Sequence, residues 1–193
     1  MRVHVLVFDG FDLLDVFGPV EPLTAAGCEV ELVHRDGPRW VTAQQGFRIE
    51  ATAALGGPDP IDGLIVPGGG WLNRADHGAW AEVQSGRLTH AITDLSARTP
   101  WLASVCSGGM ILASAGLLAG RRATTNRACF DEFRPLVGEV VDARVVDDGD
   151  RITAGALSSG LDLGLHLVSR FVGADAADDV TRRLEYPPLP EQA

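Results

Sequence analysis

Short, mostly apolar segments of this chain each run directly into a glycine-rich or polar turn, and helical stretches separate them. The segments cover residues 3–8, 28–33, 63–66 and 101–105. Strands buried on both faces form nearly continuous apolar runs, and parallel strands need crossover helices between them. The alternation therefore predicts an α/β fold: a three-layer sandwich with a mostly parallel central sheet.

The rest of the chain predicts helices and a few further strands. A short antiparallel pair is expected over 40–43 and 47–51, and two more strands over 140–146 and 151–154. We expect helices over 13–26 with an interruption at Gly18-Pro19, 78–97, 110–118, 157–172 and 174–184, the last ending before Pro187-Pro188. With 193 residues and neither repeat nor linker, the chain predicts one domain over 1–193.

Charge and hydropathy exclude several classes of partner. The formal net charge of -10 repels phosphate backbones and anionic lipid surfaces. No apolar run approaches the roughly 20 residues that cross a bilayer, and the first residues resemble a strand rather than a signal peptide. We therefore expect a cytoplasmic protein with a small-molecule substrate and neither a nucleic-acid nor a membrane partner.

The chain has three cysteines, Cys28, Cys106 and Cys129. Their odd number and wide spacing fit neither a disulfide framework nor a zinc ligand pair, so no metal site is expected. Only Cys106 directly follows a buried strand and precedes a Ser-Gly-Gly turn into a helix. Such an elbow exposes a nucleophile, and a helix N-terminus lowers a thiol pKa. We predict Cys106 as the nucleophile and the other two as small core residues.

Two further segments are candidates for the same site. The loop Pro67-Gly68-Gly69-Gly70 follows another buried strand, so the amides of Gly69 and Gly70 are candidate oxyanion donors, as is Gly108 in the elbow. Trp71 either narrows the pocket or packs beside it. Asp15 stands in an apolar stretch, where burial would raise its pKa and make it a proton donor; a helix cap or surface role is the alternative.

Four motifs together resemble the ThiJ/PfpI superfamily, which has a flavodoxin-like, class I glutamine-amidotransferase-like fold. They are Leu14-Asp15-Val16-Phe17-Gly18-Pro19, Ile65-Val66-Pro67-Gly68-Gly69, Ser104-Val105-Cys106-Ser107-Gly108 and Gly120-Arg121-Arg122-Ala123-Thr124-Thr125. The similarity continues through 158–165 to 183–188. Within the superfamily the chain looks most like the isonitrile hydratase branch and the amidase-like domain of AraC-type regulators.

The resemblance implies a catalytic set of Cys106, Asp15 and Ser107, with serine replacing a threonine and keeping its hydroxyl. It implies no cofactor and a homodimer. Asn126 stands where many members have a histidine, and it cannot act as an acid or base, which argues against a cysteine-histidine dyad; it is instead a candidate substrate-binding residue. His166 lies among leucines on a helix and is expected to be a core histidine.

Three functions are compatible with these residues. The first is hydration of an isonitrile to an N-substituted formamide through a Cys106 thioimidate, for which Asp15 supplies the proton. The second is glyoxalase-like or another thiol-dependent hydrolysis of a small carbonyl or carbon-nitrogen compound. The third is a non-catalytic ligand or redox sensor. We expect no DNA-binding module in these 193 residues, which argues against the regulator version of the third.

Overall fold

A computed structural model describes residues 1–186, and its centre is a seven-stranded sheet with the strand order β10-β11-β7-β6-β1-β2-β5. All neighbouring strands are parallel except β10, which is antiparallel to β11. The strands are β1 (Arg2–Leu6), β2 (Glu29–His34), β5 (Ala53–Ala54), β6 (Gly63–Val66), β7 (Trp101–Val105), β10 (Val145–Asp147) and β11 (Arg151–Ala154). The predicted mostly parallel sheet is confirmed.

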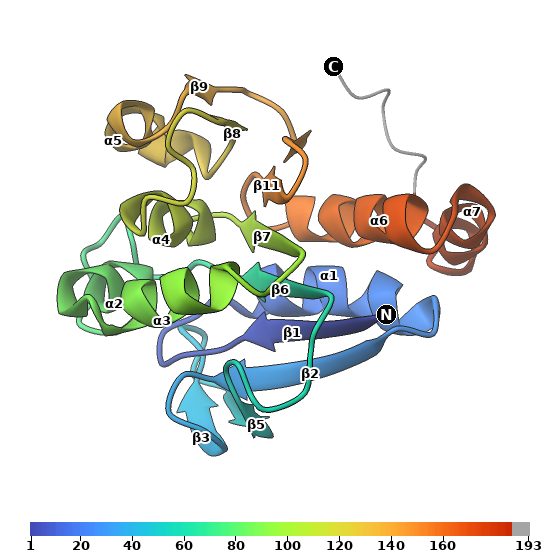
Figure 1. The fold of residues 1–193 in the computed structure, drawn as a ribbon, viewed down its shortest axis with the longest axis horizontal. Helices are drawn as coiled ribbons and strands as arrows, with labels where there is room; N and C mark the ends of the chain where they lie inside the picture. Colours follow the sequence, from blue (N-terminus) through green and yellow to red (C-terminus); the bar gives the residue numbers. More distant parts are fainter. Residues whose placement is uncertain (187–193) are drawn as a thin grey trace.

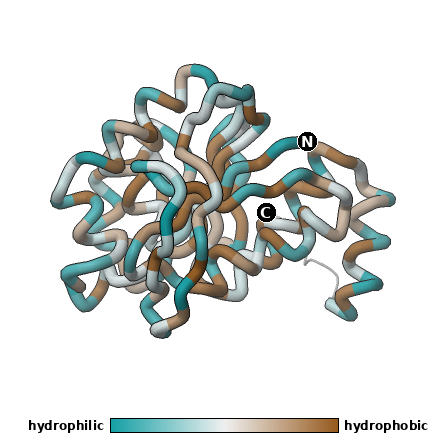
Figure 2. Tube along the Cα trace, turned by 90° about the horizontal axis from the view of Figure 1, so that it is seen from below, coloured by the Kyte–Doolittle hydropathy of each residue, from teal (hydrophilic) through white to brown (hydrophobic). Residues whose placement is uncertain are grey.

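Helices form the two outer layers (Figure 1). One group, whose members contact one another, consists of α1 (Leu13–Ala25), α6 (Ser159–Phe171) and α7 (Ala174–Arg183). The other consists of α2 (Ala79–Ser85), α3 (Arg87–Ser96) and α4 (Gly108–Ser114). Every residue of β6, β7 and β11 is buried, as strands covered on both faces require. Figure 2 shows apolar segments gathered at the centre of the molecule.

Several boundaries differ from the prediction. The helix expected over 78–97 is two helices, because Gly86 adopts a left-handed φ of 70° between α2 and α3. α1 runs without interruption through Pro19 and Pro22. The strand expected over 140–146 is divided into β9 (Glu139–Val140), which pairs with β8 (Arg122–Ala123), and β10. α5 (Phe130–Phe133) and two 3-10 turns, Arg127–Cys129 and Arg134–Leu136, were not predicted.

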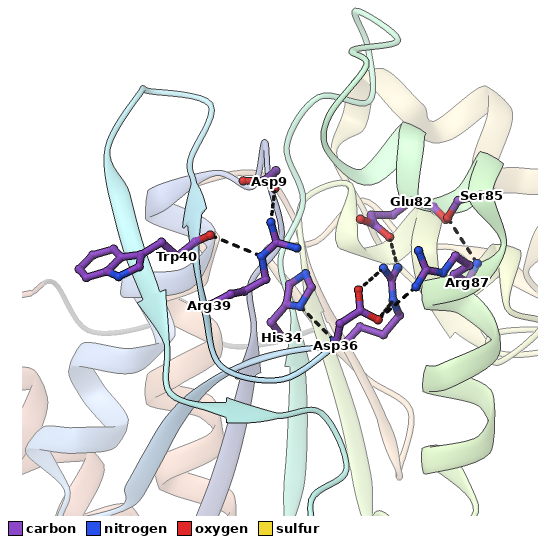
Figure 3. A network of polar contacts seen from close by, with 9 residues as sticks. Asp9, His34, Asp36, Arg39, Trp40, Glu82, Ser85 and Arg87 are labelled. Atoms are coloured by element: carbon purple, nitrogen blue, oxygen red, sulfur yellow. Dashed lines mark hydrogen bonds and ion pairs between the residues drawn. The ribbon is translucent and has the colours of Figure 1, made fainter.

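The predicted antiparallel pair is present as β3 (Arg39–Thr42) and β4 (Arg48–Ala51). Its turn is tied to the loop that follows β1, because the Gly10 N–H donates to Thr42 O at 2.8 Å and the Gln44 N–H donates to Phe11 O at 2.9 Å. Figure 3 shows Arg39 reaching Asp9 in the same loop, 3.6 Å away. The hairpin therefore holds its turn over the carboxyl end of β1.

His166 is not a core histidine. It is half-buried, and its Nε2 lies 2.7 Å from Asp147 Oδ2, which Arg170 also binds. The helix therefore turns this histidine toward a polar group on β10 rather than into the apolar interior. Pro187-Pro188 lie outside the described residues, and the prediction of one domain over 1–193 stays a prediction. Within residues 1–186 no helix is long and apolar enough to span a membrane.

Candidate active site

Cys106 occupies the elbow between β7 and α4 in a strained backbone conformation, with a φ of 54° that non-glycine residues rarely adopt. Its N–H donates to Gly155 O at 2.9 Å, and its carbonyl accepts the Thr125 hydroxyl at 2.7 Å. These contacts come from the segments after β11 and β8. Strain of this kind persists only where the surroundings enforce it, and it is common at functional sites.

The two glycines after Ser107 allow the elbow to pack closely against its neighbours. A Cβ on Gly108 would lie 2.1 Å from Val66 O, and one on Gly109 would lie 3.0 Å from Thr125 Oγ1. Gly108 was predicted as an oxyanion donor, but it is buried against the end of β6 and does not line the cavity beside Cys106. Close packing against β6 therefore explains why this position is a glycine.

A cavity of about 290 Å³ lies beside the elbow, at the carboxyl ends of the parallel strands. Its lining residues are Asp12, Gln44, Gly69, Gly70, Trp71, Leu72, Asn73, Cys106, Ser107, Asn126 and Leu157. Cys106 is only 7% exposed, so the cavity admits a small molecule to a largely covered thiol. Six predicted residues thus meet here, whereas Asp15 lies beneath the surface.

A larger hollow of about 780 Å³ lies elsewhere, along β2 and the segment 50–59. Its lining contains Arg2, His4 and several glutamates but no cysteine. Size alone does not identify a reactive site, so we assign the chemistry to the smaller cavity that contains the strained thiol.

Asp15 is completely buried in the first turn of α1, which decides between the burial and the cap or surface role that the sequence left open. Its Oδ2 accepts the Gly68 N–H at 2.9 Å, while Oδ1 has no hydrogen-bond partner in residues 1–186. Burial, followed by the nearby Asp12 carboxylate, raises the pKa of Asp15 to about 8; interactions with Gly68, Cys106 and Leu157 oppose the rise. Asp15 therefore carries a proton at neutral pH, as a general acid must.

The pKa of the Cys106 thiol moves in the opposite direction from the one predicted. Burial, followed by the charge of Asp15, raises it to about 12, and the Ser107 N–H and the Asn126 amide lower it only in part. The helix N-terminus does act on the sulfur, but desolvation of the thiolate outweighs it. At neutral pH both the thiol and the Asp15 carboxyl hold their protons.

The polar groups around the sulfur are fixed by hydrogen bonds. Asn126 Nδ2 lies 3.5 Å from Cys106 Sγ as a donor, and its Oδ1 accepts the Ala128 N–H at 3.0 Å, which sets the orientation of the amide. The Gly69 N–H donates to Ser107 Oγ at 3.0 Å. This amide is therefore already engaged, and the Ser107 hydroxyl keeps a hydrogen with which it can bind a substrate.

Trp71 both lines the cavity and packs against neighbours, so its two predicted roles coincide. The residue is 4% exposed, and its Nε1 donates to Glu132 Oε2 at 3.3 Å. Arg74 donates to the other oxygen of Glu132 at 2.6 Å and lies 4.0 Å above the ring of Trp80. This wall of the cavity is consequently held in one position.

Sequence reasoning missed Asp12, Gln44, Leu72, Asn73 and Leu157. Asp12 could have been found from the sequence. An aspartate directly before a predicted helix is a typical N-cap, and Asp12 stands three residues before Asp15 in the first turn. Nothing local marks the others, which reach the cavity through the hairpin turn, the glycine loop and the segment before α6. No histidine of the described chain lines the cavity.

The family model described as the DJ-1/PfpI family matches residues 1–170. The chain belongs to the DJ-1/PfpI family. It is similar to the solved structure of a ThiJ/PfpI family protein from Pseudomonas syringae, with 32% identity and a TM-score of 0.86 over 99% of this chain and 77% of the other. The resemblance expected from the motifs and the flavodoxin-like fold are thereby confirmed.

Curated relatives within the family differ in their named activities. An isonitrile hydratase of Pseudomonas putida is 32% identical over 98% of this chain and 80% of its own length. A deglycase of Thermococcus kodakarensis is 29% identical over 80% of this chain and 89% of its own. The regulator GbdR of Pseudomonas aeruginosa is 26% identical over 95% of this chain but only 50% of its own.

Proposed function

We propose that this protein hydrates a small isonitrile to the corresponding N-substituted formamide, with Cys106 as nucleophile and Asp15 as general acid. The observation that carries the proposal is a strained thiol that lines one small cavity, with a buried carboxyl beneath it that interacts with the same cysteine. The Oδ1 of that carboxyl lacks a hydrogen-bond partner in residues 1–186. An isonitrile carbon accepts both a proton and a nucleophile, so it requires an acid and a thiol together.

The first step follows from this arrangement of protons. Asp15 transfers its proton to the terminal carbon of the isonitrile, and the Cys106 sulfur forms a bond to that same carbon. The thiol proton passes to the Asp15 carboxylate. The product is a thioimidate bound to Cys106, and Asp15 is again protonated. A resting thiolate is not needed, so the raised thiol pKa is compatible with the reaction.

Water completes the cycle. Its oxygen bonds to the thioimidate carbon while the nitrogen gains a proton, and the carbon-sulfur bond then breaks as the remaining hydroxyl proton returns to sulfur. The products are the formamide and the free thiol. Ser107 and Asn126 offer hydrogen bonds to the nitrogen and the sulfur during these steps. The similarity to the isonitrile hydratase supports this assignment over nearly the whole chain.

A second candidate is hydrolysis of a thiol adduct of a small carbonyl compound, such as an α-oxoaldehyde. The similarity to the deglycase favours it, since that relative is nearly as close in identity. The absence of a histidine from the lining within residues 1–186 weighs against it, because removing a proton from a carbonyl adduct needs a base near the carbon.

The two reactions are separated by their products. Purified protein is incubated with cyclohexyl isonitrile or methylglyoxal, and formamide or lactate is measured against matched Cys106→Ala protein. Formamide that forms only with the wild type supports the hydratase. Lactate without formamide would replace it by the second candidate, and the absence of both would exclude both reactions with these substrates.

A further inference from the structure

Two buried carboxyls lie one turn apart at the start of α1. Asp12 is 3% exposed and Asp15 is completely buried. Asp12 Oδ1 lies 3.4 Å from the Asp15 backbone nitrogen, so the charge of Asp12 acts on the Asp15 carboxyl from within the same turn. Two carboxyls that share a buried site do not both ionise readily. Repulsion between two negative charges therefore favours the neutral form of whichever carboxyl has fewer hydrogen-bond donors.

The hydrogen bonds identify Asp12 as the charged partner. Its Oδ1 accepts the N–H groups of Leu14, at 2.9 Å, and of Asp15, at 3.4 Å. Its Oδ2 accepts the side-chain amides of Gln44 and Gln45, the latter at 2.8 Å. All four partners are donors, and Asp12 also caps the helix N-terminus, where negative charge is favoured.

The Asp15 carboxyl accepts fewer hydrogen bonds than that of Asp12, with the Gly68 N–H as its donor at 2.9 Å. The groups acting on its carboxyl are Asp12 on the same helix, Cys106 from the elbow, and the backbone N–H groups of Gly68 and Leu157. None of these groups is a cation. With one oxygen lacking a hydrogen bond in the described part of the chain, the Asp15 carboxyl is better suited to the neutral form.

We propose that Asp12 is a positioning residue, a buried carboxylate that adds to the effect of burial in keeping Asp15 in its proton-carrying form. Gln44 and Gln45 hold Asp12 in place from the β3–β4 turn, while the Asp12 N–H donates to Gly68 O at 2.9 Å. The β3–β4 hairpin thus helps to position the two carboxyls, although it contributes no acid or base of its own. The catalytic consequence rests on the proposed function; the effect on Asp15 does not.

The test is the substitution Asp12→Asn, which keeps a good helix cap and removes the charge. The Asp15 carboxyl is titrated by carbon-13 NMR of aspartate-labelled protein, with its resonance assigned from Asp15→Asn. We expect its midpoint to fall by about one pH unit relative to the wild type. An unchanged or higher midpoint overturns the proposal. Asp12→Ser is a second neutral cap, with the same expectation if Asp12→Asn does not fold.

A rate profile separates positioning from a purely structural role. The alkaline limb of kcat/KM for formamide formation should move to lower pH in Asp12→Asn, together with the NMR midpoint. A uniform loss at every pH with an unmoved limb would contradict the proposal. Asp94→Asn, which removes an exposed carboxylate on α3, is the matched control and should leave both readings unchanged. If the wild type makes no formamide, the proposed function fails, while the NMR midpoint still decides the role of Asp12.

Discussion

Replacing Asp15 by asparagine should stabilise the protein at neutral pH while removing its activity. The pKa of Asp15 is raised from 3.8 to about 8 in the folded protein, so between these values the folded state binds one proton more than the unfolded chain. Stability is therefore greatest below the unfolded pKa and falls as the pH rises through the folded one. The expected slope is about 1.4 kcal/mol per pH unit, or about 6 kcal/mol over the whole interval.

That cost is a large share of the usual free energy of unfolding, which is about 5–15 kcal/mol. Asparagine stays neutral and can still accept the Gly68 N–H, so Asp15→Asn lacks this slope. Urea unfolding at pH 5, 6, 7 and 8 measures how the free energy of unfolding changes with pH, and Asp94→Asn is the control for loss of an exposed carboxylate. The difference between Asp15→Asn and the wild type should grow steadily with pH. Parallel curves would refute the assignment of a buried, protonated Asp15.

Other substitutions test the elbow and the cavity walls. Gly108→Ala should lower Tm and activity together in thermal melts and formamide assays, because its Cβ would lie 2.1 Å from a β6 carbonyl oxygen; full activity would mean that the elbow tolerates displacement. Asn126→Ala should slow formamide formation about tenfold by removing the donor to the Cys106 sulfur, and an unchanged rate would exclude that role. Glu132→Gln should raise KM more than it lowers kcat, since it loosens the Trp71 wall; a pure kcat effect would contradict this reading.

The central strands could be predicted because strands buried on both faces consist of consecutive apolar residues, a pattern that the sequence shows directly. Residues 63–66 and 101–105 are apolar throughout, which is what a strand covered on both faces requires. The break between α2 and α3 at Gly86 could not be predicted, because residues typical of helices stand on both sides of it and a lone glycine is tolerated inside helices. The division of 140–146 depends on pairing with residues 122–123, which local sequence does not reveal.

The site was predictable where its chemistry is local. Cys106 and the glycines after it form one continuous motif, and Asp15 stands out as an acid in an apolar stretch. The predicted direction of the shift in the Cys106 pKa was wrong. The shift depends on burial and on Asp15, which is distant in sequence, and these outweigh the effect of the helix N-terminus that the sequence suggests. The bonds from Gln44 and Gln45 to Asp12 span more than 30 residues, so only the folded chain brings them together.

The central claim is that Cys106 adds to an isonitrile carbon with a proton from Asp15. Its most direct test is intact-protein mass spectrometry of Asp15→Asn, Cys106→Ala and wild-type protein, quenched during turnover of a carbon-13 isonitrile. The account predicts a labelled adduct of the full isonitrile mass on the wild type alone, followed by labelled formamide. Labelled formamide from Cys106→Ala at the wild-type rate, with no adduct on any of the three proteins, would contradict it.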